Sequence, residues 1–258
     1  MGNIGNVASN ILPDRVLAAL RILKNGLPAD QLAVPTYDQD GLKTIHNADF
    51  MHDETFKRAY EAGERLDSWF GAKIHWRAHV FFWAAARGLD LEGDFVECGV
   101  HRGGFSRAII EYIGFSGRTD KVFYLLDTYE GLSEKLVSDE EKQNGILAYP
   151  YESSYESVKH AFKEFDNVII VKGDIPDTLP EVKSNKVSYL SIDLNCAEPE
   201  IAAAEFFWDK LVSGAVIVLD DYGWAKHIVQ KHAFDEFAKQ KKVPILSLPT
   251  GQGLIIKP

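Results

Sequence analysis

The sequence has only two cysteines in 258 residues, Cys98 and Cys196, and they lie far apart. This excludes a disulfide framework and fits a reducing compartment. No run approaches the roughly 18 apolar residues of a membrane span. Asp14 and Arg15 interrupt the N-terminal stretch, and Asn6 stands where a myristoylation signal requires Ser or Thr. We therefore expect a cytoplasmic protein without a signal peptide, lipid anchor or membrane partner.

Clusters of positive charge are missing as well. The formal net charge is -10, and Lys239, Lys241 and Lys242 gather at an expected helix end, where cations complement the helix dipole. A nucleic acid partner is therefore not expected. With 46% hydrophobic and 26% charged residues, the composition is that of a globular protein. The length suffices for one large α/β domain with an extension.

The most informative stretch is residues 93–112, which read as a buried strand, a glycine-rich turn and the start of a helix. Gly99 allows the chain to turn sharply off the strand, and Gly103 and Gly104 allow close backbone approach. The helix N-terminus adds unpaired N–H groups, as in α/β proteins that hold the polar end of a nucleotide-like ligand. An ordinary strand-to-helix turn is the alternative interpretation.

The spacing within this stretch indicates the kind of ligand. An acid, Glu97, precedes Gly99 and the pair Gly103–Gly104, a pattern that differs from the dinucleotide fingerprint Gly-x-Gly-x-x-Gly and from a phosphate loop. Glu97 at the strand end can bind a cationic amine but would repel a pyrophosphate. S-adenosylmethionine carries an amine, a carboxylate and a sulfonium, and it therefore fits this turn better than NAD does.

Two later strand ends extend the expected site. The apolar strand 121–127 begins about 30 residues after the first strand, as a βαβ crossover requires, and ends at Asp127. Ligands bind at the carboxyl ends of such strands, so we expect Asp127 to accept the ribose hydroxyls. Asp174 and Ile175 follow strand 168–172 near the expected adenine ring, with a simple strand-exit turn as the alternative.

Three further carboxylates are expected to converge. Asp193 ends strand 187–193, and Asp220 and Asp221 follow the neighbouring strand 215–219. Each pair would repel by about 4 kcal/mol at roughly 4 Å and an effective dielectric constant of about 20, so the acids either protonate or hold a cation. Oxygen ligands alone favour Mg²⁺ over zinc. A helix N-cap role for Asp220 or Asp221 is the alternative.

The remaining pattern completes a seven-stranded sheet. A final hairpin over 243–248 and 254–257 makes one strand antiparallel to the others. We therefore expect an α/β protein with the Rossmann-like class I methyltransferase fold and helices on both faces of the sheet. Residues 91–258 would form the methyltransferase domain and residues 1–90 a helical N-terminal extension. The first 50 residues fit a lid, a contact in a homo-oligomer or a tail.

An apolar, aromatic helix is expected over residues 74–87, and it carries His75 and His79. Their spacing of four residues can bind a metal, but neither a glutamate nor a third histidine accompanies them. We therefore predict that both are core or surface histidines. The aromatic residues of the helix are likewise predicted to belong to the core.

Four motifs together resemble a known family. They are Gly-Asp-Phe-Val-Glu-Cys-Gly-Val-His-Arg-Gly-Gly at 93–104, Leu-Asp-Thr-Tyr-Glu-Gly-Leu at 126–132, Asp-Thr-Leu-Pro at 177–180 and Val-Ile-Val-Leu-Asp-Asp-Tyr-Gly at 216–223. In this order they resemble the macrocin O-methyltransferase (TylF-like) family, and the similarity extends over roughly residues 90–240. The resemblance implies an S-adenosylmethionine- and magnesium-dependent O-methyltransferase that acts on sugar hydroxyls of natural products.

The resemblance also implies metal ligation by Asp193, Asp220 and Asp221. The chain departs from the family pattern at His101, where a Trp is common, and at Asn195, where a second acid is usual. The residues expected to bind the donor, from the turn, the strand ends and the resemblance together, are Glu97, Gly99, Val100, His101, Arg102, Gly103, Gly104, Asp127, Thr128, Asp174, Ile175 and Asp193.

We therefore predict methyl transfer from S-adenosylmethionine to a hydroxyl of a sugar-containing or other small metabolite, with Mg²⁺ as a second cofactor. Asp193 is the first candidate for metal ligand and general base, and His101 is the second candidate for the base. One alternative is an S-adenosylmethionine-binding protein of the same fold with a regulatory or structural role. The other alternative is a nucleotide-sugar or NAD enzyme, but the sequence lacks the glycine fingerprint Gly-x-Gly-x-x-Gly.

Overall fold

The computed structural model describes residues 14–26, 34–148 and 151–258. The chain divides into two compact units. The smaller unit, within residues 1–38 and 42–48, contains helix α1 (Asp14–Asn25), strand β2 (Leu42–Thr44) and most of strand β1 (Tyr37–Gln39). The larger unit comprises residues 39–41 and 49–258 and contains every other element named below.

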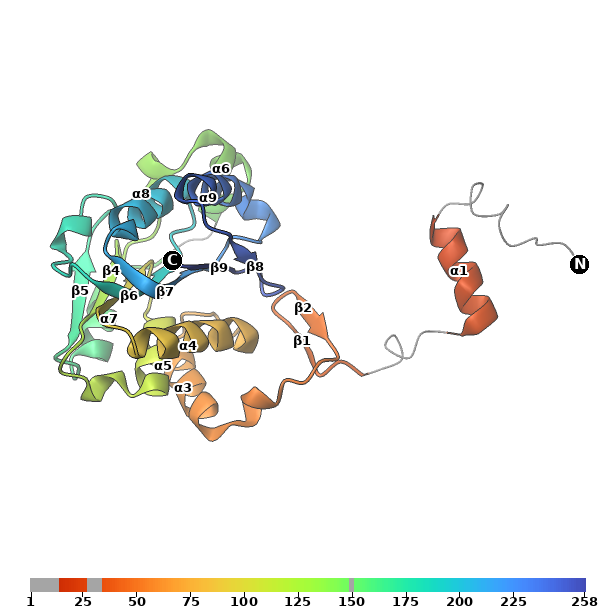
Figure 1. The fold of residues 1–258 in the computed structure, drawn as a ribbon, viewed down its shortest axis with the longest axis horizontal. Helices are drawn as coiled ribbons and strands as arrows, with labels where there is room; N and C mark the ends of the chain where they lie inside the picture. Colours follow the sequence, from red (N-terminus) through yellow and green to blue (C-terminus); the bar gives the residue numbers. More distant parts are fainter. Residues whose placement is uncertain (1–13, 27–33, 149–150) are drawn as a thin grey trace, which may run out of the picture. The chain divides into compact units, whose positions relative to one another are not determined.

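A seven-stranded sheet forms the centre of the larger unit (Figure 1). Strand β9 pairs antiparallel with β7 and with β8, and all the other pairs in this sheet are parallel. The predicted sheet with one antiparallel strand is therefore confirmed. In sheet order the strands are β5 (Val168–Lys172), β4 (Phe123–Asp127), β3 (Asp94–Cys98), β6 (Val187–Ile192), β7 (Leu211–Leu219), β9 (Gly253–Ile256) and β8 (Leu246–Ser247).

The central strands β3, β4, β6 and β7 bury side chains on both faces of the sheet. On β3, Phe95 belongs to one apolar core, whereas Val96 and Cys98 belong to the other. Helices α3, α4, α5 and α7 cover the first face, and α8 and α9 cover the second (Figure 1). This double cover explains the unbroken apolar strands of the sequence.

The α-helices of the larger unit are α3 (Glu54–Glu64), α4 (His75–Leu89), α5 (Gly104–Ile113), α6 (Asp139–Gln143), α7 (Tyr155–Phe162), α8 (Ala197–Trp208) and α9 (Ile228–Lys241). The short 3-10 helices are η3 (Asp49–His52), η4 (Phe115–Gly117), η5 (Glu134–Leu136), η6 (Ile146–Ala148), η7 (Leu179–Glu181) and η8 (Ala225–His227). Over the described part of the chain, no helix combines the length and apolar character needed to cross a membrane.

Helices α3 and α4 lie within the expected extension, residues 1–90, and both belong to the larger unit. Helix α3 packs on α5, and α4 packs on α5, β6 and β7. Residues 54–89 therefore help to cover the sheet. The division of function at residue 90 stays a prediction.

The order of the sheet creates the crevice in which a ligand would bind. Strands β4 and β5 lie on one side of β3, and β6 and β7 lie on the other. The connections leaving β3 and β6 therefore diverge, which opens a space at the carboxyl ends of these strands. Gly99 closes the base of this space: its φ is +91°, and a Cβ atom built on it would lie 1.8 Å from the carbonyl oxygen of Asp193.

This close approach makes a prediction about stability. Gly99→Ala should lower the free energy of unfolding by about 3 kcal/mol or more, because alanine adds both a left-handed backbone penalty and a collision with the backbone after β6. Urea denaturation would measure the change. Gly117→Ala is the matched control, since a Cβ atom there meets nothing within 4 Å. Its effect should stay within about 0.5 kcal/mol. Equal midpoints for the two variants would contradict the prediction.

Candidate active site

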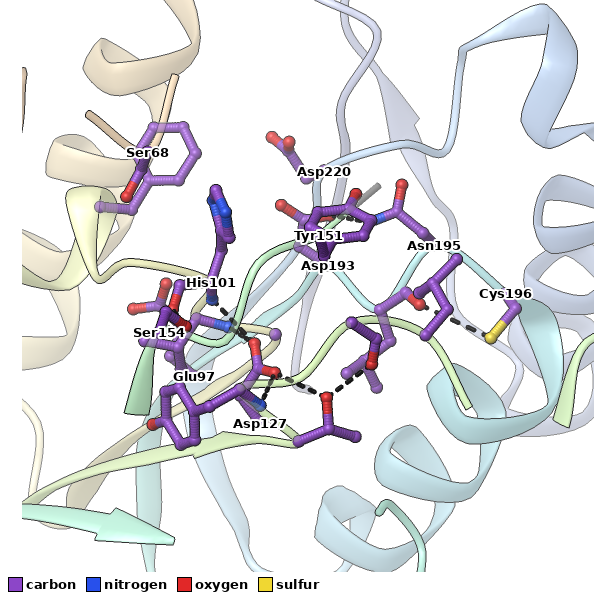
Figure 2. A pocket seen from close by; sticks show the side chains of 18 of the residues that line it. Ser68, Glu97, His101, Asp127, Tyr151, Ser154, Asp193, Asn195, Cys196 and Asp220 are labelled. Carbon is purple, nitrogen blue, oxygen red and sulfur yellow. Dashed lines mark hydrogen bonds between the residues drawn. The ribbon is translucent and has the colours of Figure 1, made fainter. Parts of the chain in front are cut away.

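A cavity of about 240 Å³ lies at the carboxyl ends of β3, β4, β6 and β7 (Figure 2). It brings the glycine turn and the expected acid cluster into one crevice, as the sequence predicts. The predicted site residues that line it are Glu97, Gly99, Val100, His101, Gly104, Asp127, Thr128, Asp174, Asp193, Asp220 and Asp221.

Three residues predicted to bind the donor lie outside this lining. The guanidinium of Arg102 pairs with Asp67 at 2.9 Å. Gly103 is the N-cap of α5, and a Cβ atom on it would lie 2.5 Å from the ring of Phe162. Ile175 is buried in the core beneath the crevice. Contact between these three residues and the donor stays a prediction.

Asp127 holds the glycine turn in place (Figure 2). Its Oδ2 atom accepts hydrogen bonds from the backbone N–H groups of Val100, at 2.6 Å, and His101, at 2.7 Å. Its Oδ1 atom accepts from the N–H of Tyr129, at 2.6 Å. The hydroxyl of Thr128 lies 3.3 Å from the same oxygen but donates to the carbonyl oxygen of Gly131 at 2.6 Å. A carboxylate offers about four acceptor sites, and three backbone N–H groups occupy three of them. Ribose binding by Asp127 stays a prediction.

Glu97 is a buried carboxyl group that lines the cavity. Only 3% of its surface is exposed, and the hydroxyl of Ser106 donates to its Oε2 atom at 2.5 Å. Burial raises the pKa of Glu97 to about 8, although the Ser106 hydrogen bond opposes the rise. At neutral pH the group is therefore mostly protonated until a cation approaches it.

The three expected acids do converge. Carboxylate oxygens of Asp193, Asp220 and Asp221 lie within 4.8 Å of one another. Burial raises the pKa of Asp193 well above its usual range, and the charges of the other two acids add to the rise. Burial and the charge of Asp220 raise the pKa of Asp221 to about 7. Their oxygen atoms form the kind of donor set that suits a hard divalent cation such as Mg²⁺.

Neither acid after β7 caps a helix. The residue that precedes η8 is Trp224, and the one that precedes α9 is His227. The alternative of an N-cap role for Asp220 or Asp221 is therefore wrong.

Arg77 of α4 also lines the cavity, and the sequence analysis missed it. Its Nη1 atom donates to Oδ2 of Asp220 at 2.8 Å, and its Nε and Nη2 atoms donate to the two oxygens of Asp40 at 2.8 and 3.2 Å. The amide of Gln252 donates to Oδ1 of Asp220 at 2.9 Å. The available sequence signal was an arginine in the first turn of an apolar, aromatic helix.

A second set of hydrogen bonds fixes the segment after β6. The amide of Asn195 donates to Oδ1 of Asp193 at 3.3 Å. Glu200, 3% exposed, accepts from the N–H of Leu194 at 3.0 Å and from the amide of Gln230 at 2.7 Å. Burial raises the pKa of Glu200 to about 8. Asn195 thus contacts one acid of the cluster.

Aromatic rings stand beside the glycine turn. The ring of His101 lies 5.3 Å from that of Phe70 and 5.4 Å from that of Tyr151, and all three residues line the cavity. Burial lowers the pKa of His101, so its ring is neutral at pH 7 and can accept a proton. Sequence reasoning missed Phe70 and Tyr151, since each lies in a loop without a recognisable motif.

The two histidines of α4 pack against aromatic rings. His75 stacks on Tyr60 with centroids 4.2 Å apart, and His79 stacks on Phe50 at 4.1 Å. Among the described residues, the one group of three or more side chains that could hold a metal ion is the acid cluster. Neither histidine belongs to it. Both side chains are half-buried among aromatic rings, and their predicted place as core or surface histidines stays a prediction.

Comparisons with known proteins find a matching family and several relatives. Residues 84–247 match the family described as macrocin O-methyltransferase (TylF). A curated relative, the 8-demethyl-8-(2,3-dimethoxy-alpha-L-rhamnosyl)-tetracenomycin-C 4'-O-methyltransferase of Streptomyces olivaceus, is 29% identical over 144 residues. The match covers 51% of this chain and 54% of the relative. The chain therefore spans about half the length of the curated relatives it matches.

Two solved structures share the fold. The O-methyltransferase NovP superposes with a TM-score of 0.61 at 20% identity, over 70% of this chain and 79% of its own. CalS11, a calicheamicin methyltransferase, superposes with a TM-score of 0.58 at 17% identity, over 87% and 98% of the two chains. At these identities the likeness shows the fold alone, which is that of class I methyltransferases.

The hydrogen bonds of Asp127 make a second prediction. Asp127→Asn places an amide against backbone N–H groups, so we expect the free energy of unfolding to fall by about 2 kcal/mol. Hydrogen exchange at Val100 and His101 should become faster. Asp174→Asn is the control, because Asp174 also lines the cavity but pairs with the exposed Lys135. Its cost should stay below about 1 kcal/mol. Unchanged exchange in Asp127→Asn would contradict the proposed support of the turn.

Proposed function

The chain belongs to the macrocin O-methyltransferase (TylF) family, and from this premise we propose that it transfers the methyl group of S-adenosylmethionine to a hydroxyl of a small metabolite. One observation carries the proposal. A single cavity joins the turn between β3 and α5, with the buried Glu97, to three acids at the ends of β6 and β7. The family match at residues 84–247 includes both groups.

The donor is proposed to bind at the glycine turn. Glu97 offers a carboxylate for the ammonium group, and the N-terminus of α5 offers N–H groups for the carboxylate of the same molecule. Asp127, Thr128 and Asp174 line the part of the cavity proposed for the nucleoside. The charges of donor and protein are complementary at both ends of the amino acid moiety.

The acceptor is proposed to bind at the acid cluster. Asp193, Asp220 and Asp221 would hold Mg²⁺, whose positive charge lowers the pKa of a bound hydroxyl. The chain itself orients that hydroxyl and takes up its proton, with Asp193 as the first candidate and the neutral His101 as the second. The bond between methyl carbon and sulfur breaks as the bond to the acceptor oxygen forms, and the proton passes to this base.

We propose a sugar hydroxyl as the acceptor. The relative from Streptomyces olivaceus is named for methylation at the 4' position of a rhamnosyl tetracenomycin. Acids and amides at one end of the cavity suit a polyol, because they accept and donate hydrogen bonds to several hydroxyls. Asn195, beside Asp193, would take part in this contact and so influence which hydroxyl is presented.

The alternative is a protein that binds S-adenosylmethionine without methyl transfer. It is favoured by Asn195, which stands where a second acid is usual, and by the two oxygens of Asp220, which accept from Arg77 and Gln252. An assay of methyl transfer separates the two possibilities.

Further parts of the proposal concern the setting of the enzyme. Both cysteines lie in the described part of the chain, buried and free, which supports a cytoplasmic location. The net charge of -10 supports a small-molecule partner rather than a nucleic acid. The first 50 residues are proposed to act as a lid, as a contact in a homo-oligomer or as a tail.

Calorimetric titration and turnover together test the function. We expect micromolar binding of S-adenosylmethionine, none of NAD, and methylated product from at least one member of a panel of glycosides in the presence of Mg²⁺. Asp193→Asn should lower kcat by about 100-fold or more, because it removes a ligand and a base. Donor binding without product from any glycoside would favour the non-catalytic alternative. No binding of the donor would overturn the proposal.

The buried carboxyl makes a prediction about pH. Glu97, with its pKa of about 8, must lose its proton to pair with the ammonium group, so donor affinity should rise as the pH increases from 6 toward 8 and then level off. Binding at pH 7 should release protons, which titrations in buffers of different ionisation enthalpy would detect. Glu97→Gln should bind more weakly and without this release. A wild-type affinity that is constant between pH 6 and 8 would contradict the assignment.

A further inference from the structure

Arg77 occupies the position where the acid cluster meets the helical layer. It lies three residues into α4 and lines the cavity beside Asp220. Its side chain is 18% exposed, and that of Asp220 is 2% exposed, so little water screens the 2.8 Å pair between them. The guanidinium also lies 5.8 Å from the ring centroid of Trp224, which limits its freedom to turn away.

The charge of Arg77 lies next to the whole cluster, because its partner Asp220 has a carboxylate oxygen within 4.8 Å of oxygens of both Asp193 and Asp221. Oδ2 of Asp220 accepts from Arg77, and Oδ1 accepts from Gln252. An incoming cation therefore meets an acid already paired with a fixed positive charge.

A fourth acid faces the guanidinium from the other side. Asp40 accepts two hydrogen bonds from Arg77, and its side chain is 12% exposed. Asp40 and Gly41, at the turn between β1 and β2, have φ angles of 54° and 72°, and both residues belong to the larger unit. Asp-Gly pairs readily adopt this left-handed turn. Arg77 thus pairs with two acids at once, and its pairing with Asp40 weakens its attraction to Asp220.

We propose that Arg77 is a resident cation of the acid cluster that competes with the divalent ion for Asp220, and that Asp40 moderates this competition. Arg77 is a positioning residue, since it acts through Asp220. The inference rests on the proposed function, in which the cluster binds Mg²⁺. The inference assigns opposite effects on the affinity for the divalent ion to Arg77 and Asp40, although the two residues form one ion pair.

Titration with Mn²⁺, followed by calorimetry and by the electron paramagnetic resonance signal of the free ion, tests the inference. Arg77→Gln should tighten Mn²⁺ binding by about tenfold or more, because a fixed positive charge leaves the cluster. Asp40→Asn should weaken it by about threefold or more, because the charge of Arg77 is then balanced by Asp220 alone. Arg77→Lys keeps the charge and should stay close to the wild type.

Arg87→Gln is the matched control. Arg87 lies on the same helix, and its Nε atom donates to the carbonyl oxygen of Gly214 at 3.1 Å, away from the cavity. It should bind Mn²⁺ as the wild type does. Near-UV circular dichroism would check that each variant is folded, and Arg77→Met would replace Arg77→Gln if that variant were not.

The outcomes distinguish failure of this inference from failure of the proposed function. Weaker or equal Mn²⁺ binding in folded Arg77→Gln, with clear binding in the wild type, would overturn the competition and leave the proposed function intact. Tightening in Arg77→Gln together with tightening in Asp40→Asn would overturn the part assigned to Asp40. Absence of Mn²⁺ binding in every variant at millimolar concentration would contradict the metal site of the proposed function and, with it, this inference.

Discussion

The contact between the turn after β3 and the end of β6 is the constraint on which the site depends. The N–H of Asp193 donates to the carbonyl of Cys98 at 2.8 Å, and the N–H of Gly99 donates to that of Leu126 at 2.9 Å. Three strands are therefore joined at one point by main-chain hydrogen bonds. Because Gly99 has no side chain, the backbone beyond β6 can lie against the turn. This places a turn suited to a charged donor next to an acid cluster suited to a cation.

The same arrangement concentrates carboxyl groups in a space with little water. Glu97, Asp220 and Glu200 are each at most 3% exposed, so burial penalises their charge. Each is stabilised by a different neighbour: the hydroxyl of Ser106, the guanidinium of Arg77 or the amide of Gln230. These neighbours fix the orientation of the acids, but burial still raises the pKa values of Glu97 and Glu200 to about 8. A bound ammonium group or divalent cation would reduce the cost of burying these carboxylates. Binding of such a ligand would therefore be favoured at the positions where burial of charge destabilises the fold.

The parts predicted from the sequence are those that depend on local patterns. Apolar runs of five or six residues identify the central strands, and the acids that follow them are carried to one edge of the sheet by the parallel topology. Arg77 could not be found in this way, because its partners lie 37 and 143 residues away along the chain. The three backbone hydrogen bonds to Asp127 were also unpredictable, since they depend on the exact path of two loops. The sequence locates an acid at a strand end, but it does not tell whether its oxygens face solvent or the backbone.

The two sides of the cavity are built from different kinds of interaction. This difference determines which substitutions the site can accept without loss of the fold. Around the glycine turn, backbone N–H groups and close backbone packing set the geometry, so most substitutions there disturb the fold as well as the site. Around the acids, side chains set the geometry: Arg77, Gln252 and Asn195 contact the carboxylates from three separate elements or loops. One of these side chains can be exchanged without moving a strand. Charge and hydrogen bonding around the acids can therefore change while the geometry of the glycine turn stays the same.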